Sequence, residues 1–210
     1  MAVSEGLYDR YLLPRLTSWV CSTENLGSCR RRVVPRASGR VVELGAGSGH
    51  NLPYYDRSAV ERVWAVEPSL EMWQLAMPRL AQAVPPVEHV AASAEAVPLD
   101  DGVADTVVVT WALCTIPHPD VALAEARRLL KPGGLLLFAE HGRAPDAGVR
   151  RWQDWLNPVW TRFSGGCNLN RDVHELLKGA GFSLEGVEAE YLPGMKPFNF
   201  NVLGAGRKPR

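Results

Sequence analysis

Short apolar runs alternate with amphipathic stretches through the middle of the chain. The apolar runs lie at Val41–Leu44, Val63–Val66, Val87–Ala91, Val107–Trp111 and Leu135–Ala139. Residues at helical spacing separate some of these runs, as in Leu70–Leu80 and Val121–Leu130. Such alternation is typical of parallel strands connected by helices that cover the sheet. We therefore expect an α/β fold with these five runs as its central strands.

Helical patterns also lie on either side of this core. The segment Leu7–Val20 is amphipathic, and Pro14 interrupts it. Apolar and aromatic residues recur at helical spacing from Val149 to Phe163, and Pro158 is expected to kink or break that helix. Both patterns predict helices outside the alternating core.

The C-terminal part of the chain predicts one more helix and two closing strands. Asn170 can cap a helix that Gly181 ends. The strands are expected near Phe182–Tyr191 and Phe198–Gly206. No internal repeat, low-complexity tract or interdomain linker interrupts the sequence, so we expect residues 1–210 to form a single domain.

The composition and charge of the chain limit the classes of molecule that it is expected to bind. Of the 210 residues, 46% are hydrophobic and 22% charged, as in a globular protein. Lys plus Arg and Asp plus Glu both number 23, so the formal net charge is zero at pH 7. The run Arg30-Arg31-Arg32 is interpreted as a solvated segment, because no basic or aromatic stripe extends it. We expect a small-molecule substrate and no nucleic acid.

The sequence also predicts a cytoplasmic protein without a metal. No apolar run reaches the ~20 residues that cross a bilayer, and the N-terminus lacks the features of an export signal. The cysteines, Cys21, Cys29, Cys114 and Cys167, show neither CxxC pairing nor histidines at zinc-ligand spacing. We therefore expect reduced thiols, no transmembrane segment and no metal site.

The strongest local signal for ligand binding is a glycine-rich turn after the first predicted strand. It reads ELGAGSG from Glu43 to Gly49, with Asn51 just beyond it. Gly45 and Gly47 allow positive φ angles and a close approach of the backbone to a ligand. The N–H groups of such a turn suit an anionic group, for example a carboxylate.

A dinucleotide fingerprint is the main alternative for this turn. It requires G-x-G-x-x-G, whereas the third glycine arrives one residue early here and position 50 is His. The spacing, together with Glu43 at the strand end, favours S-adenosylmethionine over NAD. A tight turn without a ligand is the simpler alternative.

Acidic residues after two further strands support a nucleoside site. Glu67 and Pro68 end the second apolar run, where a carboxylate can accept hydrogen bonds from both ribose hydroxyls. Ala94 and Glu95 follow the third run, where a backbone N–H and a carboxylate can contact an adenine ring. The alternatives are a helix N-terminal acid for Glu67 and a solvated loop acid for Glu95.

The segments ELGAGSG, AVEPS, SAEAVPL and LLKPGG together resemble the class I S-adenosylmethionine-dependent methyltransferases over roughly residues 40–140. The resemblance implies a Rossmann-like sheet of seven strands, six parallel and one antiparallel, with helices on both faces and a helical lid. It implies that S-adenosylmethionine is bound and S-adenosylhomocysteine released. It implies that Glu43 and Gly45–Gly49 hold the methionyl part, Glu67 the ribose, and Ala94 and Glu95 the adenine. The candidate cofactor-binding residues are Glu43, Gly45, Ala46, Gly47, Gly49, Asn51, Glu67, Pro68, Ala94 and Glu95.

The same resemblance divides the chain into four parts. Residues 1–39 are expected to form an N-terminal helical cap and residues 40–140 the cofactor-binding core. Residues 145–181 are expected to form a helical lid segment, and residues 182–207 the closing strands.

A narrower resemblance involves the second half of the chain. The segments WALCTI, FAEH, RWQ, LNPVW and GCNLNR are similar to those of small methyltransferases related to the mammalian alkyl thiol S-methyltransferases. Bacterial relatives of these enzymes include ones that cap thiols of sulfur-containing natural products. The mammalian members carry an N-terminal membrane segment, which a charged, proline-containing stretch replaces here. The resemblance implies S-methylation of a small lipophilic thiol.

A thiol acceptor needs little help from the protein. With a pKa of ~8.5 it is partly ionised near neutrality, so a strong base is not obligatory. His141, after the fifth strand, is the candidate catalytic acid/base, because its pKa suits proton transfer near pH 7. A loop anchor is the alternative for His141. Cys114 and Cys167 are interpreted as packing residues, since direct methyl transfer needs no enzyme thiol.

The acceptor pocket is expected between the N-terminal helix and the segment 152–167. Thr110 and Trp111 close the fourth strand at the edge where open α/β sheets bind ligands, and we expect both to contact the cofactor. The candidate substrate-binding residues are Tyr8, Tyr11, Trp111, Cys114, Trp152 and Trp160. Packing of the lid against the sheet is the alternative for these aromatic residues.

Two other functions fit the same motifs. One is O-, N- or C-methylation of a quinone, phenol or lipid. The other is binding of S-adenosylmethionine without catalysis. The glycine spacing disfavours an NAD-linked oxidoreductase.

Overall fold

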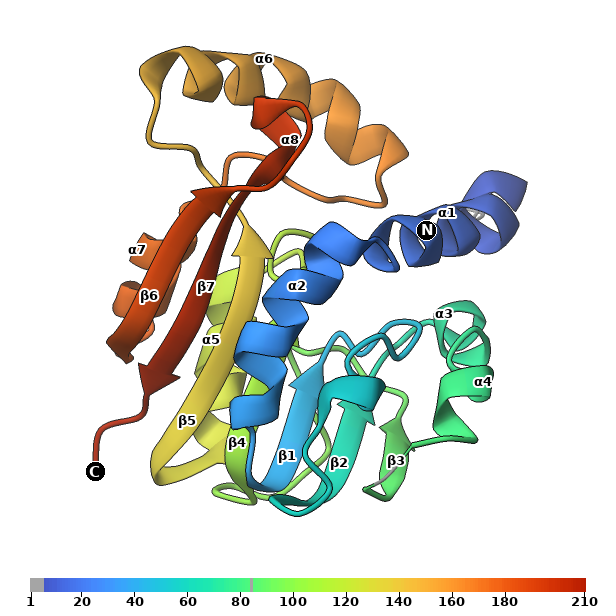
Figure 1. The fold of residues 1–210 in the computed structure, drawn as a ribbon, viewed down its shortest axis with the longest axis vertical. Helices are drawn as coiled ribbons and strands as arrows, with labels where there is room; N and C mark the ends of the chain where they lie inside the picture. The colour runs from blue at the N-terminus through green and yellow to red at the C-terminus, as the bar shows by residue number, and fades with distance from the viewer. Residues whose placement is uncertain (1–5, 84) are drawn as a thin grey trace.

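The computed structural model describes residues 6–83 and 85–210, which include a seven-stranded sheet with helices on both faces (Figure 1). The strands are β1 (Gly39–Leu44), β2 (Val60–Val66), β3 (Val87–Val90), β4 (Ala104–Thr110), β5 (Leu130–His141), β6 (Ser183–Tyr191) and β7 (Phe200–Arg207). Their order is β3-β2-β1-β4-β5-β7-β6, and β7 runs antiparallel to the other six strands of this sheet. The predicted Rossmann-like fold with six parallel strands and one antiparallel strand is confirmed.

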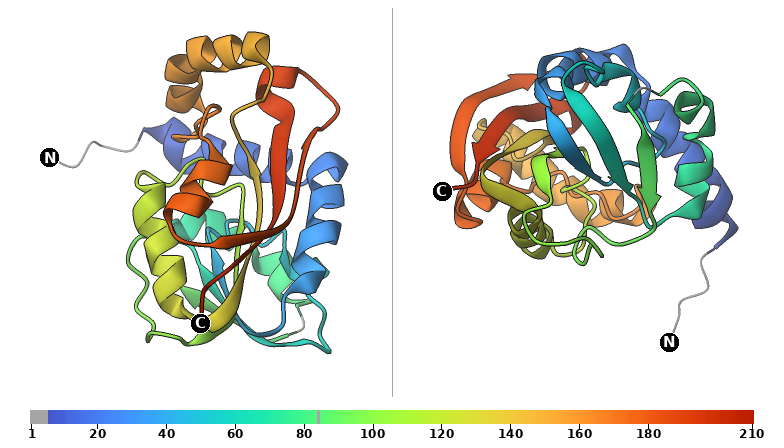
Figure 2. Two further views of the ribbon diagram at one scale, coloured as in Figure 1. Left: turned by 90° about the vertical axis from the view of Figure 1, so that its left-hand side faces the viewer. Right: turned by 90° about the horizontal axis from the view of Figure 1, so that it is seen from below.

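Helices cover the two faces and one end of the sheet. The helices are η1 (Tyr8–Leu12, a π-helix), α1 (Leu13–Cys21), α2 (Glu24–Val33), α3 (Leu70–Gln74), α4 (Met77–Leu80), α5 (Pro119–Leu129), α6 (Ala147–Phe163), α7 (Val173–Gly179) and α8 (Lys196–Asn199), with 3-10 turns η2 (Val34–Arg36) and η3 (Leu52–Tyr54). Figures 1 and 2 show α2 on one face of the sheet and α5 with α7 on the other. The helix α6 lies beyond the end of the sheet, in contact with α8.

The alternation of side chains along β1 explains the two apolar layers. Val41 is fully buried and packs in the layer that contains Cys29 and Val33 of α2. Val42 points the other way and packs in the layer that contains Leu123 of α5. A strand that is buried on both faces reads as a continuous apolar run, which is why the sequence predicts these strands well.

Prolines lie in the first turn of α1 and α4 and in the interior of α6. Pro14 lies in the first turn of α1, where its missing N–H would have no helical partner in any case, and η1 precedes it. The pattern predicted as one helix at Leu70–Leu80 forms the two short helices α3 and α4, with Pro78 in the first turn of the second. The helix α6 runs through Pro158 without a break.

Two local expectations are wrong. Asp172 caps α7, and its carboxylate accepts a hydrogen bond from the Glu175 N–H at 3.1 Å, so the cap is not Asn170. The run Arg30-Arg31-Arg32 is part of α2 and is not solvated throughout. Helical geometry turns Arg30 toward the sheet, where only 4% of it is exposed, while Arg31 and Arg32 are exposed.

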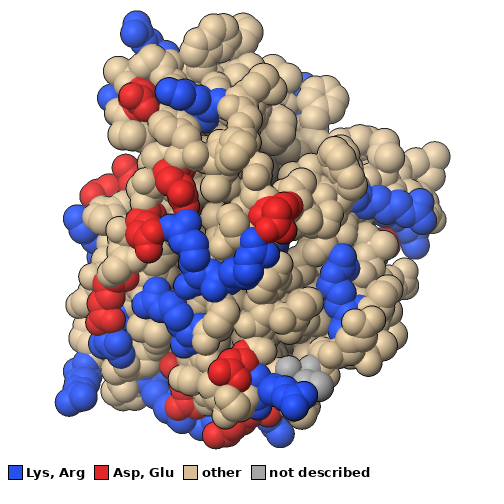
Figure 3. All heavy atoms as spheres, in the orientation of Figure 1, with Lys and Arg blue, Asp and Glu red and all other residues tan. Residues whose placement is uncertain are grey.

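The surface has no large region of one charge on the face drawn in Figure 3. Acidic and basic side chains are interspersed over its lower part, and the upper part over α6 and α8 is mostly uncharged. Within residues 6–83 and 85–210, no helix combines the length and apolarity needed to cross a membrane.

Candidate active site

A cavity of about 750 Å³ lies at the carboxyl ends of the central strands. Parallel α/β sheets bind their ligands at this edge, where the loops after successive strands converge. Residues of the N-terminal helices η1, α1 and α2 line one side of the cavity. Its lining includes Arg10, Leu13, Pro14, Thr17, Cys21, Arg30, Glu43, Gly45, Ala46, Gly47, Ser48, His50, Asn51, Glu67, Pro68, Ser93, Ala94, Thr110, Trp111, Thr115, Ser164 and Gly165.

The glycine-rich turn after β1 forms one wall. Gly45 has φ +69°, and a Cβ there would lie 2.5 Å from the Cβ of Ala112. The Gly47 N–H donates a hydrogen bond to Glu67 Oε2 at 2.9 Å. The buried hydroxyl of Ser48 has no hydrogen-bond partner among the described residues. Glycine is therefore required at position 45, and the turn presents a polar group that a ligand can satisfy.

Glu43 sits at the end of β1 in a buried hydrogen-bond network. The Tyr55 hydroxyl donates to Oε2 at 2.7 Å, and the Asn51 amide donates to Oε1 at 3.0 Å and to the Thr110 hydroxyl at 2.9 Å. Burial raises the pKa of Glu43 to about 7, although these hydrogen bonds and Arg30 act to lower it. A cation next to this carboxyl group would favour its ionised form.

Arg30 connects α2 to this network, and sequence reasoning missed it. Its Nε donates to Asn51 Oδ1 at 3.0 Å, and its Nη1 donates to the Cys21 carbonyl at 2.7 Å. The guanidinium group lies 4.7 Å from the centroid of the Trp111 ring. Arg30 therefore fixes the orientation of two predicted cofactor-binding residues. The one available signal was helical spacing from Cys29 and Val33, which places Arg30 beside the buried face.

Trp111 has a backbone conformation that bulky residues rarely adopt. Its φ is +48°, and it is the only residue other than glycine with a positive φ among the described residues. Hydrogen bonds hold it there: its backbone N–H donates to the Ala139 carbonyl at 2.8 Å, and its indole N–H donates to Asn201 Oδ1 at 2.9 Å. Such conformations cluster at functional sites, where the surroundings compensate for their energy.

Glu67 follows β2, and its carboxylate is hydrogen-bonded to the turns after both β1 and β2. Its Oε1 accepts a hydrogen bond from the Ser69 N–H at 2.9 Å, as its Oε2 does from Gly47. Burial raises the pKa of Glu67, against the lowering effect of these two hydrogen bonds. A carboxylate has about four acceptor positions, so two are left for a ligand.

These groups fit S-adenosylmethionine. The cofactor carries an ammonium group, a carboxylate and two ribose hydroxyls. The cavity offers the Glu43 carboxyl group, the Gly-rich turn with the free Ser48 hydroxyl, and the remaining acceptor positions of Glu67. Each polar part of the cofactor thus has a counterpart of suitable chemistry.

The cavity lining includes most of the predicted cofactor-binding residues. They are Glu43, Gly45, Ala46, Gly47, Asn51, Glu67, Pro68, Ala94, Thr110 and Trp111. Gly49 and Glu95 are not among the lining residues. The Glu95 carboxylate instead accepts hydrogen bonds from the Ser93 hydroxyl at 2.9 Å and the His118 N–H at 2.8 Å.

The predicted substrate-binding residues are more dispersed. Tyr8 donates a hydrogen bond through its hydroxyl to the Phe163 carbonyl at 2.6 Å, which connects η1 to the end of α6. Tyr11 and Trp152 are exposed, and Trp160 packs against Phe198 with ring centroids 4.8 Å apart. Of the six, only Trp111 is among the residues that line the cavity.

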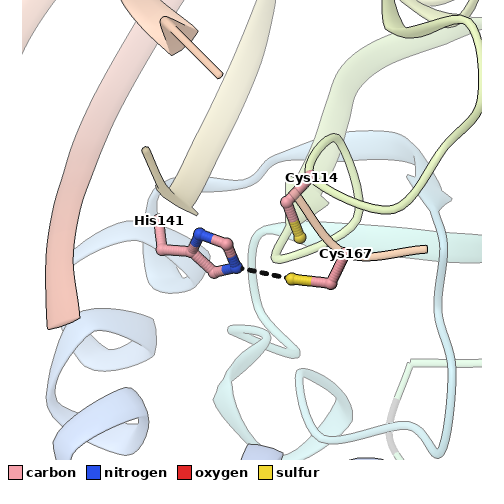
Figure 4. A group of neighbouring side chains, drawn as sticks. All are labelled: Cys114, His141 and Cys167. Carbon is pink, nitrogen blue, oxygen red and sulfur yellow. Dashed lines mark hydrogen bonds between the residues drawn. The ribbon is translucent and has the colours of Figure 1, made fainter. Parts of the chain in front are cut away.

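His141 lies next to two cysteines (Figure 4). Its Nε2 is 2.8 Å from Cys167 Sγ, and the ligand atoms of Cys114, His141 and Cys167 all lie within 4.8 Å of one another. Burial acts to lower the pKa of His141, but Cys167 and Glu140 outweigh it and the pKa is raised. None of the three lines the cavity, although Thr115, Ser164 and Gly165, which flank the cysteines, do.

Known proteins match the chain at the level of both sequence and fold. Residues 42–138 match the model of a methyltransferase domain family. Human thiol S-methyltransferase TMT1B is 35% identical over 157 residues, covering 70% of this chain and 62% of that protein. Human thiol S-methyltransferase TMT1A is 30% identical over 189 residues, covering 82% of this chain and 74% of that protein.

Other similar proteins have a different named activity or share the fold at low sequence identity. The ubiquinone/menaquinone biosynthesis C-methyltransferase UbiE of Rubrivivax gelatinosus is 33% identical over 134 residues, covering 64% of this chain and 49% of that protein. The crystal structure of the Bacillus halodurans protein BH2331 has a TM-score of 0.71 at 18% identity, covering 90% of this chain and 100% of that one.

The chain spans slightly less than two thirds of human TMT1B and about three quarters of TMT1A. The family match, the sheet order and the cavity lining agree on the cofactor. The chain belongs to the class I S-adenosylmethionine-dependent methyltransferases and is related to the thiol S-methyltransferases TMT1A and TMT1B.

Proposed function

We propose that this methyltransferase transfers its methyl group to the sulfur of a small thiol. The observation that carries the proposal is the similarity to thiol S-methyltransferases TMT1B and TMT1A, at 35% and 30% identity. UbiE, whose name gives a quinone-pathway C-methyltransferase, is similar over a shorter part of the chain.

The ionisable side chains in the cavity favour an acceptor that needs no strong base. Glu43 is engaged by Tyr55 and Asn51. His50 donates from Nε2 to the Ser18 carbonyl at 2.9 Å, and burial lowers its pKa to about 4, so it is neutral near pH 7. A thiol is already a few per cent ionised at neutrality and intrinsically nucleophilic, whereas a hydroxyl group demands a base.

The residues of the cavity have distinct roles in this proposal. When bound, S-adenosylmethionine supplies a methyl group activated on a sulfonium. Glu43 and the turn after β1 hold the methionyl part, Glu67 and Pro68 hold the ribose, and Ala94 contacts the adenine. In-line displacement at carbon requires alignment and exclusion of water, which the walls formed by α1 and by the loop after α6 provide.

The acid/base role predicted for His141 is not part of this proposal. Its Nε2 contacts Cys167 and the residue does not line the cavity. A small lipophilic thiol enters instead between Leu13 and Thr17 of α1 and Ser164 and Gly165 after α6, four lining residues that carry no charge.

Matched acceptors test the proposed function. An alkyl thiol and the alcohol of the same chain length, together with a hydroxyquinol, are incubated with the protein and S-adenosylmethionine, and all products are quantified by mass spectrometry. We expect a methyl thioether and S-adenosylhomocysteine in equal amounts, and no methyl ether. Methylation of the quinol ring with no thioether would overturn the thiol proposal and leave the methyltransferase assignment intact.

A further inference from the structure

The cluster of Cys114, His141 and Cys167 is separate from the groups that bind the cofactor. Cys114 lies in the loop after β4, His141 ends β5, and Cys167 lies in the loop after α6. Three segments that are far apart in the sequence thus bring two buried thiols and one imidazole together (Figure 4).

Hydrogen bonds fix the loop that carries Cys114. The Glu140 carboxylate accepts hydrogen bonds from the N–H groups of Ala112 at 2.8 Å, Leu113 at 3.0 Å and Cys114 at 3.4 Å. Because Glu140 precedes His141 in β5, the same strand end holds both the loop and the imidazole. This rigid support is what a preorganised ligand set requires.

The loop that carries Cys167 is connected to the first loop. The Asn168 N–H donates to the Cys114 carbonyl at 2.8 Å, and the Asn168 side-chain amide donates to the same carbonyl at 3.1 Å. The Asn157 side chain accepts a hydrogen bond from the Leu169 N–H at 2.7 Å, which attaches this loop to α6. These hydrogen bonds therefore hold the two cysteine-bearing loops against each other.

The spacing of the ligand atoms suits a tetrahedral metal ion. Zn²⁺ bound at ~2.3 Å from sulfur and ~2.0 Å from nitrogen holds its ligands about 3.5–3.8 Å apart. The three ligand atoms here lie within 4.8 Å of one another, with His141 Nε2 and Cys167 Sγ 2.8 Å apart. Side-chain movements of about 1 Å convert one arrangement into the other.

The ligand chemistry selects the metal. Two thiolates and a neutral imidazole are soft to borderline ligands, which favour Zn²⁺ over Mg²⁺ or Ca²⁺. Two thiolates also neutralise a divalent cation, so the filled site carries no net charge into the interior. Thr115, Ser164 and Gly165, which lie close to the two cysteines in the sequence, line the cavity, so the cavity is the side from which a fourth ligand can approach.

We propose that Cys114, His141 and Cys167 form a binding site for one Zn²⁺ ion, with water or a ligand from the cavity in the fourth position. This site is additional to the proposed thiol methylation and does not depend on which acceptor is used. It also differs from the expectation of no metal, which considered only ligand spacing along the sequence.

The test is metal uptake by the full-length protein, purified with a non-chelating reductant so that all thiols are free. The protein is dialysed against excess Zn²⁺ and then against buffer, and bound zinc is measured by mass spectrometry. We expect one zinc per chain and, with Co²⁺ instead, the visible absorption of a tetrahedral cobalt thiolate. The metal is expected to raise Tm by about 5 °C or more.

Variants identify the ligands. Cys167→Ala and His141→Ala are expected to weaken zinc binding at least 100-fold and to remove the cobalt absorption. Cys29→Ala, which removes a buried cysteine of α2 outside the cluster, is expected to keep one zinc per chain. No zinc retained by reduced wild-type protein would overturn the proposal, and so would zinc retained equally by Cys167→Ala. Neither result bears on thiol methylation, which the product assay measures separately.

Discussion

Sequence motifs predict some of the residues that line the cavity and fail to predict others. Glu43, Gly45 and Glu67 were expected at the site because each lies within a short motif next to a strand end. Arg30 was not singled out as a site residue, yet it lines the same cavity. The contacts of Arg30 are with Asn51 and Trp111, and no pattern local to position 30 reveals them. Charge alone suggested a solvated residue.

Glu43 should make cofactor binding depend on pH. Its pKa is raised to about 7 in the free protein, so it is mostly protonated at pH 6. An ammonium group beside it favours the carboxylate, so binding releases a proton and strengthens as pH rises. We expect the Kd for S-adenosylmethionine to fall up to about tenfold between pH 6 and 7.5, measured by calorimetry.

The matched variant for this prediction is Glu43→Gln, which keeps the shape and cannot ionise. It should bind S-adenosylmethionine more weakly and with a nearly flat pH profile over the same range. An unchanged pH profile in the variant would assign the dependence to another group.

Arg30 should contribute strongly to stability. Replacement with Met keeps most of the apolar stem but leaves Asn51 Oδ1 and the Cys21 carbonyl without their buried donor. We expect Arg30→Met to lower the free energy of unfolding by about 3 kcal/mol, measured by urea denaturation. Arg31→Met, on the exposed side of α2, should change it by less than about 0.5 kcal/mol. Equal effects of the two substitutions would contradict the burial of Arg30.

At the scale of elements, the sequence predicts the strands better than the helices. The strands β1, β2, β4 and β5 are buried on both faces, so their apolar runs are continuous. The sequence pattern does not predict α2, because Arg30, Arg31 and Arg32 separate the apolar residues Cys29 and Val33 that form its buried face. Capping of α7 by Asp172 and the continuation of α6 through Pro158 depend on local geometry that composition does not determine.

The turn after β1 should tolerate no side chain at position 45. In Gly45→Ala the added Cβ meets the Ala112 Cβ at 2.5 Å, and φ is +69°. We expect a loss of about 2 kcal/mol of stability and at least tenfold weaker S-adenosylmethionine binding, since the turn must move. Gly148→Ala is the control, because a Cβ there meets nothing within 4 Å. A tight-binding Gly45→Ala variant would show that the turn does not approach the cofactor.

Gln153 should hold α6 against the end of β5. It is 1% exposed; its Oε1 accepts from the Ala144 N–H at 3.0 Å and its Nε2 donates to the Gly142 carbonyl at 3.0 Å. We expect Gln153→Ala to accelerate hydrogen exchange selectively in residues 147–163, because these buried groups lose their partners. The exposed neighbour Arg151 provides the control Arg151→Ala, which should leave exchange unchanged.

At the scale of the whole molecule, two loops and the end of β5 converge beside the cavity, and only the fold reveals this. The cysteines and His141 lie 26 or more residues from each other along the chain, so ligand spacing in the sequence gives no sign of a shared site. The strand order explains why they meet: β5 lies beside β4, and the loop after α6 returns to the same end. Motifs predict the lining residues that follow β1 and β2, whereas the lining residues from α1, α2 and the loop after α6 come together through contacts between distant segments.

A labelled methyl group shows whether the protein transfers it from S-adenosylmethionine to a thiol sulfur. The protein is incubated with S-[methyl-13C]adenosylmethionine and a compound that carries both a thiol and a hydroxyl group, and the product is examined by carbon NMR. We predict that the labelled carbon is bonded to sulfur, with one S-adenosylhomocysteine formed per label transferred. Label on oxygen or carbon, or no transfer to any such acceptor by protein that binds the cofactor, would contradict thiol methylation by this protein.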